Sequence, residues 1–436
     1  MEKKTKNYLF LIFGLSIYVS YFLSYFFGEN SIGSGGYNGD LTWIWNNFDI
    51  FKNNNLIDSI NHEKFFGNRT PLLYILNIYF NPFINDIDNY RLSLFIFFLT
   101  CPIILFFTLK NHFQKCNYFI LFFISSFLLL SPYFRSSSVW GQEINYGIFS
   151  LLLSFFYFTK FKIKQTFSNF FLVIFFSSSC VYFDQKLLIV PLYIFLQVIF
   201  QTKISIIMKA SSCFLYFIFS IPFIYLITIW GGVVPSLTQE SNFHSFNSLN
   251  NFNLHFYHIG FAATLIALYL IPLILLKKKI DFVIIIDFIK SNIFVILIPF
   301  IAYLLFYINY DWYDLLQNKL YVTPSGNTYG LGFVNKLGLI LFDEIYLRKI
   351  FTYFAFLISW SIIVFAIKLR VTKWFLINYF FLISLILLPI MQEYFDPYIF
   401  LLSILMSNRE YEFEFKSTLS SGLFFLAALS FAIIYY

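Results

Sequence analysis

The amino-acid sequence predicts an all-helical integral membrane protein with many transmembrane helices, and three observations support this class. Of its 436 residues, 59% are hydrophobic and only 12% are charged. Apolar runs of about twenty residues, the length that a helix needs to cross a bilayer, recur from end to end. These runs are continuous rather than alternating, which predicts helices instead of a closed barrel. We therefore expect a single integral membrane domain over residues 1–436.

The first apolar run, residues 8–27, follows the basic start MEKKTK and lacks the small-residue cleavage site of a signal peptide. We expect it to be a retained anchor. Further runs fall at 90–109, 116–134, 146–159, 167–183, 187–200, 206–229, 258–276, 292–309, 351–367, 374–391, 397–407 and 419–436. Together they predict about thirteen transmembrane helices, several of them short.

Lysine and arginine are concentrated in the N-terminus and in alternate short loops, which together hold about 19 of the 29 such residues. This asymmetry predicts that the N-terminus and the basic loops are cytoplasmic. Three long polar segments then lie on the opposite, non-cytoplasmic face, at 28–89, 230–258 and 311–349. Because the conspicuous polar residues lie in these segments, we expect the functional face to be the outer one.

The sequence does not support a metal, cofactor or nucleic-acid site. The four cysteines stand at wide, irregular spacing in or beside apolar runs, which suits neither a disulfide framework nor a zinc site. The spacing of His244, His255 and His258 does not follow a ligand pattern either. The net charge of +7 is spread over loops, where it sets membrane orientation. We predict no metal, no cofactor and no nucleic-acid partner.

The stretch GGYNGDLTWIW, residues 35–45, is the first long polar break after the first run, and it places Asp40 just beyond that run. Apolar and aromatic residues follow at helical spacing, which predicts an amphipathic helix lying in the membrane interface. These residues are Leu41, Ile44, Trp45 and Phe48. A second short helix is expected after Pro71. The first outer segment is thus predicted to carry interfacial helices.

Four short segments carry a family resemblance. They are NGD after the first run, NRTPLLYIL after the loop helices, YRLS at the start of the next run, and SPYFRSSSVWGQEINYG, which contains Glu143, after the third. In this order they resemble the GT-C type of membrane glycosyltransferases, which include protein O-mannosyltransferases, lipid A aminoarabinose transferases and dolichol-dependent sugar transferases. The resemblance is best over residues 1–160, and YFDQKLLIVPLY, IWGGVVPS and MQEYFDPYIF are similar to segments of bacterial members.

The resemblance implies a GT-C-like fold and transfer of a sugar from a polyprenyl-phosphate donor to a lipid, glycan or protein acceptor. It implies that Asp40 is the general base for the acceptor hydroxyl and that Glu143 is a second acidic residue of the site. The residues expected to bind the substrates are Arg69, Arg135, Lys186 and Glu393. The expected location is the bacterial cytoplasmic membrane rather than the ER, with membrane lipids as further partners.

Each candidate residue also has a structural interpretation. Asp40 is well placed to cap the helix that follows it, and Glu143 to offset the positive end of the next run. The cations near run ends, Arg91 among them, could extend along the helix to the membrane surface. For function, the alternatives are a transporter or flippase of a lipid-linked sugar, and a polysaccharide polymerase. A transporter would show interrupted helices and paired charges inside the membrane.

Overall fold

The computed structural model describes residues 3–31, 39–67, 69–201, 204–235, 238, 254–277, 282–308, 332–387, 390–407 and 413–435. Over these ranges every regular element is a helix and none is a strand, which confirms the all-helical prediction. Of the predicted outer segments, most of 230–258 and the first half of 311–349 lie outside the described residues.

Within these ranges, 8 helices are long and apolar enough to cross a membrane. They are α1 (Lys3–Phe26), α5 continued by α6 (Ile87–Phe98 and Thr100–His112), α9 (Ile144–Ile163), α12 (Ile206–Trp230), α14 (His258–Lys277), α15 (Phe282–Ile308), α18 (Ile345–Lys368) and α21 (Phe415–Tyr435). A further candidate is bent by 66°, where α7 (Tyr118–Ser126) and the 3₁₀ turn η2 (Phe127–Leu130) meet α8 (Pro132–Val139). The coarse prediction of a multi-pass helical membrane protein is thereby supported.

The remaining helices are shorter. The apolar ones are α10 (Phe167–Phe183), η3 continued by α11 (Gln185–Leu188 and Ile189–Phe200), α17 (Gly332–Leu341) and α19 (Trp374–Ile386). The others are α2 (Asp40–Asn53), α3 (Leu56–Ile60), α4 (Leu72–Phe80), η4 (Gln392–Tyr394) and α20 (Tyr398–Met406). Each apolar run predicted from the sequence coincides with a helix or helix pair, whereas α17 lies in the segment expected to be a loop.

Two of the long helices leave most of their apolar side chains exposed. Ile206 at the start of α12 is 78% exposed, and Phe294 in the middle of α15 is 76% exposed. Proteins in water rarely leave large continuous apolar faces open, whereas lipid covers such faces without penalty. The exposed faces of α12 and α15 therefore support their insertion in a membrane.

The helices form two compact units. Unit 1 comprises Met1–Asn242, Asn247–Leu249 and Ala432–Tyr436, and unit 2 comprises Phe243–Phe246 and Asn250–Phe431. Unit 1 contains α1, α5 with α6, α9 and α12, whereas unit 2 contains α14, α15, α18 and most of α21. Both units therefore hold candidate spans.

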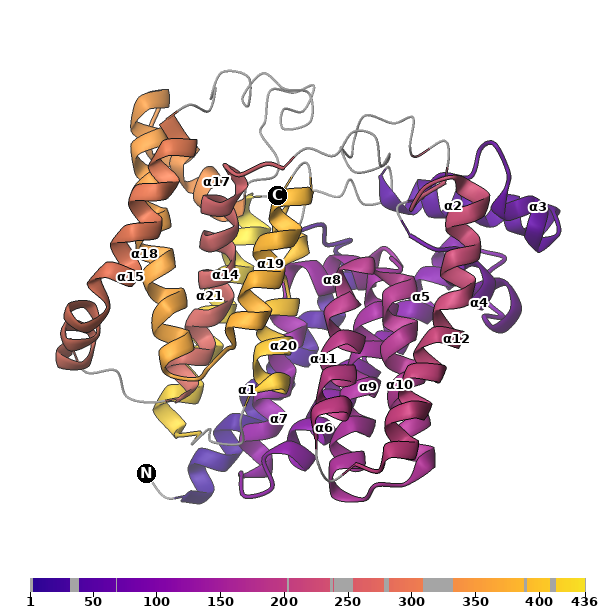
Figure 1. The fold of residues 1–436 in the computed structure, drawn as a ribbon, viewed down its shortest axis with the longest axis horizontal. Helices are drawn as coiled ribbons and strands as arrows, with labels where there is room; N and C mark the ends of the chain where they lie inside the picture. Colours follow the sequence, from indigo (N-terminus) through magenta and orange to yellow (C-terminus); the bar gives the residue numbers. More distant parts are fainter. Residues whose placement is uncertain are drawn as a thin grey trace. The chain divides into compact units, whose positions relative to one another are not determined.

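In unit 1 the long helices run side by side, with α9 packed on α10 and α6, and α1 packed on α7 (Figure 1). At one end, Asn117 before α7 donates to Asn7 near the start of α1 over 2.6 Å. At the other end, Thr70 donates to the carbonyl oxygen of Tyr182, also over 2.6 Å. In Figure 1, α2, α3 and α4 lie at this second, upper end. The first outer segment, 28–89, is therefore remote from the basic N-terminus.

The two helices predicted within segment 28–89 are confirmed. α2 begins at Asp40 and buries Leu41, Ile44 and Phe48 as its spacing predicted, whereas Trp45 is only half-buried. α4 begins directly after Pro71, whose fixed φ suits a helix start. α3 was not predicted, and the location of these helices in a membrane interface stays a prediction.

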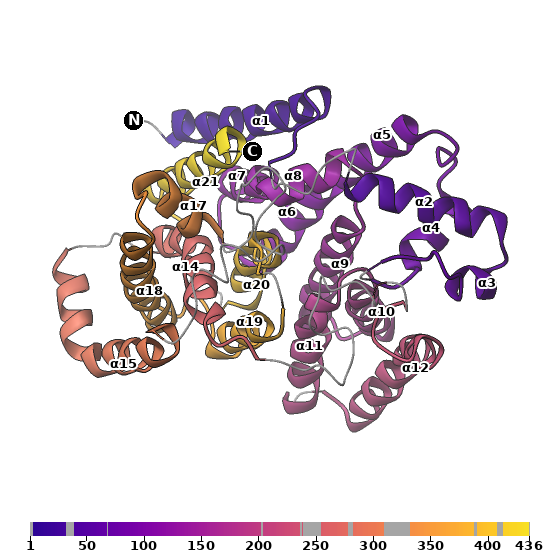
Figure 2. The same cartoon turned by 90° about the horizontal axis from the view of Figure 1, so that it is seen from above.

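In unit 2, α14 occupies the centre and packs on α17, α18, α19 and α20 (Figure 2). A helix that is apolar on all sides is expected to be enclosed in this way, and most of α14 is buried. Glycines permit two close approaches. Gly260 lies against the hydroxyl of Tyr303 on α15, and Gly332, with φ of +74°, lies against Leu265. A β-carbon at either glycine would overlap its neighbour.

Candidate functional site

Asp40 is the first residue of α2, and its carboxylate lies close to the loop that joins α8 to α9. Gln142 in this loop donates from Nε2 to Asp40 Oδ2 over 2.7 Å. The cap position of α2 is held by Gly39, which offers no side-chain bond. The capping interpretation of Asp40 is therefore wrong in its simple form, although its charge still lies in the first helical turn, where the helix dipole favours it.

The α8–α9 loop is held firmly. Gly141 has a φ of +64°, a conformation that glycine adopts without strain, and its carbonyl accepts from the hydroxyl of Tyr90 on α5 over 2.7 Å. The side chain of Gln142 is 3% exposed, and its Oε1 accepts from the hydroxyl of Ser137 over 3.0 Å. Its backbone N–H also donates to the carbonyl of Ser137. The loop thus has one defined conformation.

Glu143 follows directly and forms an ion pair with Arg69 from the segment between α3 and α4. The distance between Glu143 Oε1 and Arg69 Nη1 is 2.5 Å, and the two side chains are 14% and 19% exposed. Glu143 stands at the cap position of α9 but makes no capping bond with its side chain. Its carboxylate is therefore directed to Arg69 rather than to the start of the helix.

A second pair, Asp184 and Lys186, lies beside the first. Lys186 Nζ is 3.4 Å from Asp184 Oδ2, and Asp184 also accepts from the backbone N–H of Lys186 at the start of η3. Burial by itself would lower the pKa of Arg69, but the carboxylates of Glu143 and Asp184, with the phenol of Tyr133, raise this pKa well above its ordinary value. Arg69 is therefore a permanent cation between two acidic groups.

Three of the residues assigned from the sequence, Glu143, Arg69 and Lys186, thus belong to one charged cluster at the upper end of unit 1. The charged cluster consists of Glu143, Arg69, Asp184 and Lys186. Asp40 bonds to Gln142, the residue directly before Glu143. Asp184 is an addition, although its short turn between two apolar runs was conspicuous in the sequence. The cluster combines carboxylates that can accept a proton with cations that can hold a phosphate.

Polar side chains on the short helices line the same end, and the sequence had not indicated them. Asn47 on α2 donates to the hydroxyl of Tyr74 on α4 over 2.8 Å. Burial and the negative charge of Glu143 raise the pKa of Tyr74, so this phenol stays neutral. On α9, Tyr146 donates to Asn77 over 3.2 Å. Of these residues, Asn47 alone could have been noticed in the sequence, because it is a polar residue on the buried face of an amphipathic helix.

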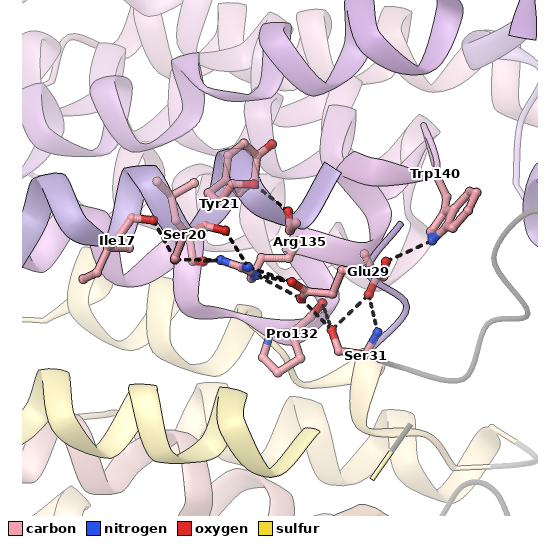
Figure 3. A network of polar contacts seen from close by, with 11 residues as sticks. Ile17, Ser20, Tyr21, Glu29, Ser31, Pro132, Arg135 and Trp140 are labelled. Carbon is pink, nitrogen blue, oxygen red and sulfur yellow. Dashed lines mark hydrogen bonds and ion pairs between the residues drawn. The ribbon is translucent and has the colours of Figure 1, made fainter. Parts of the chain in front are cut away.

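Arg135 lies on α8 and does not belong to the charged cluster. Figure 3 shows its guanidinium pointing to the carboxylate of Glu29, which accepts from Nε and Nη2 at 2.6–3.1 Å. The other donors reach the side chain and carbonyl of Ser20 and the carbonyl of Leu129. With all its N–H groups engaged and its side chain 4% exposed, Arg135 has no donor left for a ligand unless Glu29 moves.

Glu393 lies in η4 and belongs to unit 2, whereas the charged cluster belongs to unit 1. In the same segment Gln392 donates to the hydroxyl of Tyr269 on α14 over 2.9 Å. Arg91 stacks its guanidinium 4.2 Å from the ring centre of Trp140 and pairs with Asp88, so it is a structural contact of α5.

No group of three or more His, Cys, Asp or Glu that could hold a metal ion occurs within the described residues. Comparison with protein-family models, with curated proteins and with solved structures finds no match for this chain. The features that bear on function are therefore the charged cluster and its position at one end of the helices of unit 1.

Proposed function

We propose that this chain is a GT-C-like membrane glycosyltransferase that moves a sugar from a polyprenyl-phosphate donor to a lipid, glycan or protein acceptor. The observations that support the proposal are the charged cluster, which contains Glu143, Arg69 and Lys186, and the hydrogen bond from Gln142, the residue before Glu143, to Asp40. A base for a hydroxyl and cations for a phosphate are the two requirements of this reaction, and they come from four separate parts of the sequence.

In the proposed step, the acceptor oxygen forms a bond to the anomeric carbon while its proton passes to Asp40. The bond between this carbon and the phosphate oxygen breaks, and its electron pair stays on the phosphate. General-base assistance of this kind contributes about 10²–10⁴-fold in rate. Arg69 and Lys186 stabilise the charge that grows on the phosphate, because fixed cations there need no reorganisation. Glu143 holds Arg69 in place.

In the proposed topology, about thirteen spans cross the bacterial cytoplasmic membrane, the N-terminus is cytoplasmic and the charged cluster faces outward. The short apolar helices α10, α11 and α19 would then cross as well. In a cysteine-free background, Glu63→Cys at the cluster end should react with an impermeant thiol reagent in intact cells. Lys115→Cys at the opposite end should react only after permeabilisation. The reverse pattern would refute the orientation.

The activity is tested by Asp40→Asn, which keeps the size of the side chain and removes its basic oxygen. Asp49→Asn is the matched control, since Asp49 is exposed on the same helix. Lipid-linked sugars and envelope glycans are profiled by mass spectrometry in cells with no gene, the wild-type gene or either variant. Cells with Asp40→Asn should show the same profile as cells without the gene, namely an accumulated sugar donor and an acceptor that lacks one sugar. Cells with Asp49→Asn should show the wild-type profile. Full complementation by Asp40→Asn would end the proposal for this base.

One observation favours the second candidate, a flippase of a lipid-linked sugar. The 66° bend between η2 and α8 interrupts a candidate span, and broken helices are common in transporters. The same profile separates the candidates. A complete lipid-linked product trapped on the cytoplasmic side in the deletion strain would indicate a flippase. An accumulated monosaccharide donor together with short chains of an unpolymerised glycan would indicate a polymerase.

A further inference from the structure

We propose that Gln142 is a positioning residue that orients the carboxylate of Asp40 and keeps it ready to accept a proton. This role deepens the proposed function and rests on it. The central contact is the 2.7 Å hydrogen bond from Gln142 Nε2 to Asp40 Oδ2. The sequence does not reveal this contact, because the two partners are 102 positions apart in the chain.

The direction of this bond follows from chemistry. An ionised carboxylate only accepts hydrogen bonds, so the group of Gln142 that faces it has to be the NH₂ and not the carbonyl. The hydroxyl of Ser137 supports the same orientation, because it donates to Gln142 Oε1 on the other side of the amide over 3.0 Å. Ser137, Gln142 and Asp40 thus form a chain in which each donor faces an acceptor.

The amide can act as a rigid support because its surroundings allow little movement. Gln142 is almost fully buried, and Gly141 before it is in the left-handed region with its carbonyl held by Tyr90. A β-carbon on Gly141 would meet the Tyr90 ring at 2.7 Å. Glu143 follows in the same loop, so one rigid element sets the positions of both acidic residues.

A hydrogen bond donated to the charged form of a carboxyl group favours that form. Gln142 therefore keeps Asp40 ionised down to lower pH than a carboxylate without this bond. Within the part of the chain that the structure describes, ionisable groups near the loop include Glu143 with Arg69, Glu29 with Arg135, Tyr90 on α5 and Tyr74 on α4. All of them are retained in the variants below, so their contributions stay constant.

The test measures the protonation of Asp40 without any substrate. Full-length protein in nanodiscs is treated with a carbodiimide and an amine tag across a pH series, and tagging of Asp40 and Asp49 is read by peptide mass spectrometry. Protonated carboxyl groups react, so the midpoint reports the ionisation of each. Variants Gln142→Met and Gln142→Glu remove the donor or replace it by a charge. Gln201→Met, at the end of α11, is the control substitution.

Gln142→Met should raise the Asp40 midpoint by about one to two pH units, since a hydrogen bond to a charged group contributes roughly 1.5–3 kcal/mol. Gln142→Glu should raise it further, because a like charge disfavours ionisation. The Asp49 midpoint should be the same in every variant. Ser137→Ala, a milder change that keeps the amide but frees its orientation, should give a smaller rise, and it serves if the Gln142 variants do not fold.

An unchanged Asp40 midpoint in the folded Gln142 variants, or in Ser137→Ala if only this variant folds, would overturn the positioning role. Transfer assays on the same preparations keep this outcome apart from failure of the proposed function. Where transfer is detected, the acid limb of its pH profile should move with the tagging midpoint. A shifted midpoint in a protein whose wild-type form transfers no sugar would support the positioning role and reject the glycosyltransferase.

Discussion

Two arginine–glutamate pairs lie among the described residues of unit 1, and they differ in a way that their sequence contexts do not suggest. Arg135 is 4% exposed, and every N–H of its guanidinium has a partner, with Glu29 taking the largest share. Arg69 is 19% exposed, and within the described part of the chain its guanidinium makes one hydrogen bond, to Glu143. Both arginines are equally good phosphate candidates by sequence.

The difference indicates separate tasks. A buried guanidinium with no spare N–H group has a structural role, and the bonds around Glu29 show which segments it holds together. The carbonyl of Glu29 accepts from Trp140, and Ser31 bonds to Ser136 on α8, so the chain after α1 is fastened along α8. Arg69 has donors left and can bind an anion while it holds Glu143. We therefore propose that Arg69, rather than Arg135, binds the phosphate of the sugar donor.

Breaking the Arg135 pair should produce the largest loss of stability. Glu29→Gln leaves a buried cation without its counter-charge, and the removal of one partner of such a pair costs about 3–5 kcal/mol. Unfolding in detergent, followed by circular dichroism or by thermal aggregation, measures this loss.

The double variant Glu29→Gln with Arg135→Gln sharpens the result, because both charges are then gone and the desolvation cost disappears with them. It should be more stable than either single variant. If the single variants unfold like the wild type, the pair of Arg135 and Glu29 contributes little to stability. The distinction between the two pairs would then be lost.

This comparison also shows which parts of the molecule could be predicted from the sequence. The helices follow from local patterns, because apolar run length and spacing are properties of neighbouring residues, and α2 with its buried Leu41 and Ile44 is an example. Asp40 and Glu143 were selected as a pair through an ordered resemblance. Gln142, which bonds to Asp40, directly precedes Glu143, and the roles of both acidic residues stay predictions. The predicted run 292–309 matches the part of α15 that follows a kink at Asn292, whereas the part from Phe282 to this kink was not predicted, because Asp287 and Lys290 interrupt its apolar run.

The missed residues share a physical cause. Glu29, Gln142 and Tyr90 act through partners more than about fifty residues away, and no local pattern marks such contacts. Arg135 was placed in the substrate site for the same reason, since its counter-charge 106 residues upstream was not visible. That assignment stays a prediction, but its bonds now favour a structural role.

The second prediction concerns substrate use and should have an intermediate effect. Arg69→Gln should weaken use of a limiting polyprenyl-phosphate donor by about 1.5–3 kcal/mol, the value of a hydrogen bond to a charged group, as should Lys186→Gln. Stability should fall less than in Glu29→Gln, because Arg69 and Glu143 are partly open to solvent. Transfer is measured at limiting and saturating donor with purified protein. Arg135→Gln is the comparison, and a larger loss of donor use per folded molecule there would reverse the assignment.

The smallest effect on stability is expected at Arg91, whose contacts differ from those of both Arg69 and Arg135. Its guanidinium stacks on Trp140 at 4.2 Å and donates to the carbonyl of Val139 over 3.0 Å, so it packs against the end of α8. Its acidic partner, Asp88, is 73% exposed and contributes little. Arg91→Lys keeps the charge but loses the planar stack, and it should cost about 0.5–1 kcal/mol of stability with donor use unchanged.

Lys110→Gln is a suitable control, because Lys110 lies 4.7 Å from the ring centre of Tyr118 at the opposite end of unit 1. If Arg91→Lys reduces use of the sugar donor as strongly as Arg69→Gln, then Arg91 also contacts the phosphate, and it belongs to the binding site rather than to the structural contacts of α8.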